Sequence, residues 1–372
     1  MSANLLYTDV ENDLRASVRD LLGDRCAPSD VIALTESGQP VDLALWRSLS
    51  ADLGVTSLHV AENRGGQGAT ARETAVVMEE LGRFVAPVPF LGSAVLATAA
   101  LLACAPSNEV DRLLGSLASG ATTGTLAVPL SACAGDAQAA KVRADGEGLS
   151  GTVSTVADAG IADLLIVPAS GPDGPELHAV RIADGRVAVA PAVSLDMTRP
   201  VADVGLDRAP SVRLAGPEGA ESAVDSALST GAGLLASEQV GLAERCLETT
   251  VAHVKERHQF GRPVGSFQAI KHRLADLWQE IALARAAARY AADALATDSP
   301  DVPVAVRVAQ SLCATVAVHA AEECVQLHGG IGMTWEHPAH LYLKRAKADQ
   351  VALGTPGRHR ARLAPLVNLP AA

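Results

Sequence analysis

The chain has 372 residues, enough for two or three domains of ordinary size. Hydrophobic residues make up 48% of it and aromatic residues only 3%, so a large core must be built mainly from Ala, Val and Leu. The formal net charge of −12 argues against nucleic acid as a general partner, and an anionic ligand would need a local cluster of basic side chains.

The cysteines and the longest uncharged stretch bear on the compartment of the chain. No CxxC pair and no signal peptide is found, which predicts buried, reduced thiols in a cytoplasmic protein. Residues 85–105 carry no charge, but their two prolines and alanine-rich composition favour a buried helix over a membrane span. The six cysteines are Cys26, Cys104, Cys133, Cys246, Cys313 and Cys324.

Residues 1–121 are predicted to form an N-terminal helical domain. The stretch "TDVENDLRASVRDLL" offers Thr8 or Asp9 as a helix cap, and "LALWRSLSADLG" and "ARETAVVMEELGR" are amphipathic. The glycine-rich "AENRGGQGAT" between these last two could cradle a phosphate. Because it follows no clear strand and lacks a Walker lysine, the pattern favours a connecting loop.

Residues 122–219 are predicted to form a middle β-sheet domain. Short β-rich runs such as "TLAVPL", "ADLLIVPAS" and "RVAVAPAVSL" are separated by turns such as Asp145-Gly146 and Asp184-Gly185. This spacing is typical of an antiparallel sheet or small barrel. A Rossmann unit is not supported, since no helices of 10–15 residues alternate with the strands.

Residues 220–372 are predicted to form a C-terminal four-helix bundle. Helices are expected over about 231–257, 302–327 and 339–352. Between the first two of these, apolar residues recur at alternating steps of four and three, as in a bundle seam. The fold class expected is therefore α+β and mostly α. The seam residues are Ile270, Leu274, Leu277, Ile281, Ala284, Ala288, Ala291 and Leu295.

The connection "KERHQFGRPVGSFQ" between two bundle helices has an unusual composition. Arg257 and Arg262 carry guanidinium groups, whose planar fork matches the oxygens of a pyrophosphate. Phe260 and Phe267 offer apolar faces nearby, and the Gln268 amide can bind a ribose or a ring edge. The alternative is a helix C-terminus whose basic residues interact with the helix dipole.

A second unusual stretch is "ECVQLHGGIGMTWEHPAHLYLKRAKADQ". Its glycines allow a close approach of the backbone to a ligand, and Gln326 one turn earlier could bond to a nucleotide. The spacing of His328, His337 and His340 matches no common zinc pattern, so we expect no metal site.

These two stretches resemble the C-terminal domain of the acyl-CoA dehydrogenase family, and "ENRGGQGAT" with "VVMEELGR" resembles its N-terminal domain. The resemblance covers essentially the whole chain. It implies FAD at a subunit interface, an acyl-CoA substrate, α,β-desaturation, and an electron-transfer flavoprotein as electron acceptor. The residues that match the family's contacts to the pyrophosphate and adenosine of FAD are Arg257, Phe260, Gln268, Gln326, Gly329 and Gly330.

The match fails at the catalytic base, a Glu that removes the α-proton. The two positions where the family carries this Glu are occupied here by Leu353 and Gly231. Glu238, two turns beyond Gly231, is a candidate for a displaced base, although a structural role in the bundle is the favoured interpretation. Asp349, one turn before Leu353, is expected to face a different direction and ranks lower.

The match also fails where the family contacts the flavin ring. Residues 128–136, "VPLSACAGD", replace a "TEPGAGSD"-like run, and Thr155–Ala157 replace a Trp-Ile-Thr segment. This combination resembles the subunit without the catalytic Glu in actinobacterial α2β2 acyl-CoA dehydrogenases that act on steroid side chains as CoA esters. Two alternatives stay open: a self-sufficient homo-oligomeric dehydrogenase, and a catalytically silent scaffold.

Overall fold

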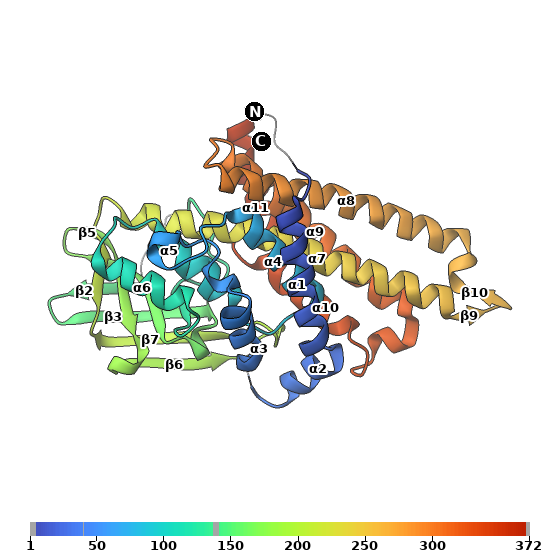
Figure 1. Ribbon diagram of the computed structural model, residues 1–372, viewed down its shortest axis with the longest axis horizontal. Helices are drawn as coiled ribbons and strands as arrows, with labels where there is room; N and C mark the ends of the chain where they lie inside the picture. The colour runs from blue at the N-terminus through green and yellow to red at the C-terminus, as the bar shows by residue number, and fades with distance from the viewer. Residues whose placement is uncertain (1–4, 40, 137–140, 370–372) are drawn as a thin grey trace.

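The computed structural model describes residues 5–39, 41–136 and 141–369. Helices precede and follow a β-sheet along the chain, and the sheet lies at one end of the long helix α7 (Ala220–Glu256) (Figure 1). This order agrees with the mostly helical α+β fold class that the sequence predicts.

The N-terminal part is helical, as expected, and its helices begin at polar caps. Thr8 and Glu11 form a reciprocal capping box at the start of α1, and Thr70 and Glu73 form another at the start of α4. The helices are α1 (Asp9–Arg25), α2 (Pro28–Glu36), α3 (Leu43–Arg47), α4 (Ala71–Phe84), α5 (Thr98–Leu102) and α6 (Asn108–Ala118).

The uncharged stretch 85–105 folds into the core. A π-helical segment, Phe90–Ala97, runs directly into α5, and every residue of that segment is buried. All six cysteines are free and buried, as the sequence predicts. In the described part of the chain, Val302–Met333 alone is helical, long and apolar enough to cross a membrane. Of its apolar window 61% is buried inside the fold, as in a core helix.

The middle part is one eight-stranded sheet with the order β6-β7-β3-β2-β4-β5-β8, and β1 pairs with β4. Most pairs are antiparallel, but β1 and β2 each run parallel to β4. The sequence patterns did not predict β7. The strands are β1 (Gly124–Leu126), β2 (Val142–Asp145), β3 (Gly148–Ala157), β4 (Leu164–Gly171), β5 (Gly174–Arg181), β6 (Val187–Ala192), β7 (Val201–Ala209) and β8 (Val212–Ala215).

The C-terminal part is the bundle. The predicted seam of α8 is buried from Leu277 to Ala291, whereas Ile270 and Leu274 near its start and Leu295 at its end are half-buried. The first helix begins at residue 220, eleven residues before the expected 231 (231 − 220 = 11). A short hairpin of β9 (His258–Gln259) and β10 (Arg262–Pro263) joins α7 to α8. The helices are α7 (Ala220–Glu256), α8 (Gln268–Ala296), α9 (Val302–His328), α10 (Ala339–Val351) and α11 (Pro356–Leu363).

Candidate functional site

The two unusual stretches come together in one groove. It lies where α7 ends, α8 begins and α9 ends, and it has a volume of about 620 Å³. Four of the six predicted cofactor residues line it: Arg257, Gln326, Gly329 and Gly330. The other lining residues are His253, Gln259, Val264, Ile270, Arg273, Leu327, His328 and Ile331.

Arg257 supplies the groove with an available cation. It follows the last residue of α7, and its backbone N–H donates to the His253 carbonyl at 2.8 Å. No carboxylate of the described residues forms an ion pair with Arg257. In contrast, Arg273 makes two bonds to Glu323, of 2.8 and 2.6 Å. Arg257 is therefore the guanidinium free to bind an anion in this groove.

The glycines after α9 have different roles. Gly329 has a φ of +64°, a conformation that favours glycine. A Cβ atom on Gly332 would lie 2.5 Å from the Val325 carbonyl oxygen, so close packing requires glycine there. A Cβ atom on Gly330 would meet nothing within 4 Å. The packing of the chain does not require glycine at 330, and the missing side chain leaves room beside the groove.

Phe260 and Gln268 do not line the groove. Phe260 occupies the tip of the hairpin with a φ of +54° and is 90% exposed. Its ring meets Phe267 edge-on at 6.1 Å, and the Arg262 guanidinium lies 3.9 Å from the Phe267 ring. Gln268 is exposed at the first position of α8. Both residues flank the groove, on a surface that a second chain could cover.

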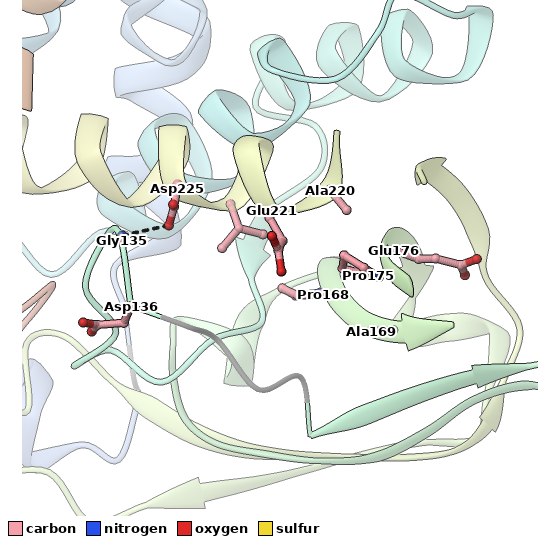
Figure 2. A pocket seen from close by; sticks show the side chains of 10 residues that line it. Gly135, Asp136, Pro168, Ala169, Pro175, Glu176, Ala220, Glu221 and Asp225 are labelled. Atoms are coloured by element: carbon pink, nitrogen blue, oxygen red, sulfur yellow. Dashed lines mark hydrogen bonds between the residues drawn. The ribbon is translucent and has the colours of Figure 1, made fainter. Parts of the chain in front are cut away.

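The residues that line the groove offer groups that could hold the ADP portion of a dinucleotide. One unpaired guanidinium, one side-chain amide and a glycine-rich turn provide donors for phosphate and ribose oxygens. A second cavity, of about 330 Å³, lies between the sheet and the start of α7 (Figure 2). Its lining includes Glu221 and Asp225, which form no ion pair among the described residues, so it disfavours an anionic ligand.

The two family positions for the base lie side by side and are filled by apolar groups. A Cβ atom placed on Gly231 would lie 2.5 Å from Leu96 Cδ2 and 3.0 Å from Leu353 Cδ1. Leu353 is 1% exposed, and its backbone N–H donates to the Leu130 carbonyl at 2.7 Å. This place in the fold holds no proton acceptor and little space for a substrate.

The segment Thr155–Ala157 forms the end of β3 and presents no aromatic surface. Thr155 is exposed with a φ of +54°, and its N–H donates to Asp203 Oδ1 at 2.9 Å. Val156 and Ala157 are buried in the sheet. The segment therefore cannot supply a flat face for a flavin ring.

Glu238, the candidate base, is held by two buried guanidinium groups. Its Oε1 accepts from Arg345 Nη1 at 2.6 Å and from Arg199 Nη2 at 2.7 Å, and its Oε2 accepts from Arg199 Nη2 at 2.6 Å. These cations lower the pKa of Glu238 against the opposing effect of its burial. A carboxylate fixed in this way is a poor proton acceptor.

Asp349, which was ranked below Glu238 as a candidate base, belongs to the same ionic cluster as Glu238. It pairs with Nη1 of Arg199, the same guanidinium that binds Glu238. Asp196 completes the cluster by pairing with Arg345 Nε at 2.6 Å. The cluster joins the loop between β6 and β7 to α7 and α10. Sequence reasoning missed both arginines and Asp196; the only signal was charged residues in otherwise apolar surroundings.

The charges of this cluster balance only if some carboxyls are protonated. Two guanidinium groups, Arg199 and Arg345, face Glu238, Asp196, Asp349 and the nearby Asp158. Burial raises the pKa of Asp349 to about 7 and that of Asp158 to about 6. The pKa values of Glu238 and Asp196 are lowered by the arginines, although burial opposes this effect. Asp349 and Asp158 are therefore the two carboxyls of the cluster that most readily hold a proton.

Replacing Asp349 with asparagine is expected to flatten the pH dependence of stability. A buried acid whose folded pKa is raised binds its proton more tightly than the unfolded chain does. Its contribution to stability is full below the unfolded pKa of about 3.9 and is lost as the pH rises to the folded value. The urea concentration at the midpoint of unfolding of the wild type should decrease as the pH rises from about 4 to 7. If the urea midpoint of Asp349→Asn decreases as steeply with pH as that of the wild type, another group causes the pH dependence.

The chain belongs to the acyl-CoA dehydrogenase family. Residues 8–121 match the model for the acyl-CoA dehydrogenase N-terminal domain, and residues 218–366 match that for the acyl-CoA dehydrogenase C-terminal domain.

Among the relatives, the acyl-CoA dehydrogenase IpdE2 of Mycobacterium tuberculosis is 36% identical over 344 residues, which is 92% of each chain. Among solved structures, the ChsE4-ChsE5 complex from Mycobacterium tuberculosis matches with a TM-score of 0.88 and 29% identity, over 99% of this chain and 100% of the matched one. A variant of the Tcur3481-Tcur3483 steroid ACAD matches with a TM-score of 0.85 and 29% identity, over 97% of this chain and 98% of the other.

Proposed function

We propose that this chain is one subunit of an FAD-dependent acyl-CoA dehydrogenase with α2β2 composition. It holds the ADP portion of an FAD whose ring lies in a homologous partner, and the partner supplies the catalytic Glu. The complex desaturates an acyl-CoA thioester between its α and β carbons, and a steroid side-chain CoA ester is the substrate proposed. This substrate class rests on the similarity to the steroid ACAD Tcur3481-Tcur3483.

The observation that carries the proposal is a difference between two places in the fold. The groove keeps an unpaired Arg257, the Gln326 amide and an open glycine turn. The family positions for the base are closed by leucine side chains around Gly231. A chain that has the groove residues but lacks the catalytic base suits a role in binding the cofactor of a neighbouring subunit.

The two alternatives fit less well. A self-sufficient enzyme would need a base, and both Glu238 carboxylate oxygens are engaged by arginines. A silent scaffold would not need an unpaired arginine beside a groove of about 620 Å³.

In the proposed complex, FAD would supply hydride acceptance from the β-carbon, and an electron-transfer flavoprotein would be the electron acceptor. This chain contributes to binding. Arg257 offers two parallel N–H donors to a diphosphate, and Gln326 can donate to a ribose or adenine acceptor. Phe260, exposed at the hairpin tip, is positioned to be covered by the partner.

Expression of the chain with and without its partner tests the proposal. Alone, it is expected to be colourless and inactive toward acyl-CoA in a dye-reduction assay. Its exposed apolar groups, including Phe260 and Trp278, favour poor solubility. Co-expression with a homologous chain that carries the Glu should restore solubility, yellow colour and activity. A yellow, active homo-oligomer would overturn the proposal.

Replacing Arg257 with alanine is expected to weaken FAD retention in the co-expressed complex. Loss of a charge-assisted contact of this kind costs about 1.5–3 kcal/mol. FAD absorbance of the purified complex during dilution measures the effect. Arg262→Ala is the matched control, since the Arg262 guanidinium lies over Phe267 and does not line the groove. Equal FAD affinity in wild type and Arg257→Ala would remove Arg257 from the site.

A further inference from the structure

Two of the three helix ends at the groove are electrostatically unfavourable for an anionic ligand. α7 ends at Glu256 and α9 ends at His328, so both present the negative end of the helix dipole. Only α8 begins there, at Gln268, with its positive end. A diphosphate in this groove therefore needs more than one cation near the ends of α7 and α9. Arg257 is one, at the end of α7.

His328 occupies the corresponding place at the end of α9. Its Nδ1–H donates to the Cys324 carbonyl at 2.7 Å, and the Cys324 sulfur lies 3.7 Å from the same nitrogen. A carbonyl oxygen only accepts, so Nδ1 carries a proton and Nε2 is the nitrogen left for a ligand. His328 is 7% exposed and lines the groove, which makes it part of the wall.

Two further imidazoles fix the His328 ring. The His253 ring lies 4.3 Å from that of His328, and the His337 ring lies 4.4 Å from it. These neighbours come from α7 and from the segment between α9 and α10. The ring of His328, on α9, is therefore held between α7 and the segment that follows α9, and its orientation does not depend on a ligand.

The stack favours a proton on its central member. Hydrogen bonds to Cys324 raise the pKa of His328 against the effect of burial. Burial, with the charge of His328, lowers the pKa values of His253 and His337. The end of α9 also favours a cation there. The elements packed around this stack also carry other titratable or charged groups: Cys246, Glu256, Arg257, Cys324 and His340. Arg273 lines the same groove.

We propose that His328 is a ligand-contacting residue of this groove, whose Nε2 donates to the diphosphate of a bound ADP-containing dinucleotide. The proposal rests on the proposed function, because it assumes that the groove holds the ADP portion of FAD. Arg257 and His328 then offset the negative ends of α7 and α9, one cation at each helix end. His253 and His337 position the His328 ring.

The pH dependence of binding is the first test. ADP-ribose is a suitable probe, since its diphosphate diester has no group that titrates near neutrality. Calorimetric titration of the flavin-stripped complex between about pH 6 and pH 8.5 covers the range of an imidazole. Affinity should be highest at the acidic end and fall as His328 loses its proton. A flat profile in the wild type would overturn the proposal, and this arm needs no variant.

The second test uses His328→Gln, with His340→Gln as the matched control. The His340 ring stacks on Trp335 and does not line the groove. His328→Gln should lower ADP-ribose affinity about tenfold at the acidic end and remove the pH dependence, as expected for loss of a charge-assisted bond. His340→Gln should keep most of the pH dependence. If His328→Gln binds ADP-ribose with the affinity and the pH dependence of the wild type, the proposal is overturned.

Different results would contradict the role of His328 and the proposed function. If ADP-ribose binds and binding needs Arg257 but not His328, only the inference about His328 fails. If the wild-type complex binds no ADP-ribose at any pH and Arg257→Ala retains FAD fully, the proposed function fails with it.

Discussion

Replacing Arg345 with methionine is expected to lower the free energy of unfolding by about 3–5 kcal/mol. Arg345 is 2% exposed and donates to Asp196, to Glu238 and to the carbonyl and hydroxyl oxygens of Thr198. Methionine removes the cation but leaves the carboxylates buried. The remaining arginine, Arg199, would then face all the acids of the cluster. Urea unfolding followed by circular dichroism measures the loss.

Lys347→Met provides the control on the same helix. Lys347 pairs with Glu322 at 2.8 Å on the surface, and exposed pairs contribute about 0–1 kcal/mol. If Arg345→Met and Lys347→Met destabilise the chain equally, the buried cluster is not what joins the sheet to α7 and α10.

Introducing a base at Leu353 is expected to destabilise the chain without creating an active enzyme. In Leu353→Glu, a carboxyl would replace a side chain that packs beside Gly231 and Leu96. Burying this group without a partner costs on the order of 3 kcal/mol, and burial would raise its pKa. The flavin-ring contacts of the family would still be missing at Thr155–Ala157. Thermal unfolding and acyl-CoA-dependent dye reduction by the chain alone are the measurements.

Leu353→Met is the matched control, since a swap of similar volume in a core usually costs less than about 1.5 kcal/mol. Substantial desaturase activity in Leu353→Glu alone would show that the rest of the active site is intact in this chain. That result would favour the self-sufficient alternative.

Much of the fold was predictable because its signals are local. The alternating apolar steps of α8 and the caps of α1 and α4 depend on residues within a few turns. The start of α7 was missed because residues 220–230 are rich in Ala and Ser and lack a clear apolar period. β7 was missed because "VADVGLDRA" contains Gly and two Asp residues, which are uncommon in strands.

The candidate groove was partly predictable and the ionic cluster was not. Arg257 and Gly329 stand at helix ends, where sequence motifs indicate both the structure and the chemistry. The partners of Arg345 and Arg199 in the cluster lie 39 to 150 residues away along the chain. A single sequence carries no signal for such pairs. The same limit hid the parallel pairing of β1 with β4.

The amount of FAD bound per chain tests the central claim most directly. A complex of this chain with its Glu-bearing partner should be purified, and its flavin absorbance compared with its protein concentration. If this chain binds the ADP portion of an FAD whose ring lies in the partner, the complex should hold about one FAD per heterodimer. The chain alone should hold no FAD. One FAD per chain in a homo-oligomer of this protein, or two per heterodimer, would contradict the account.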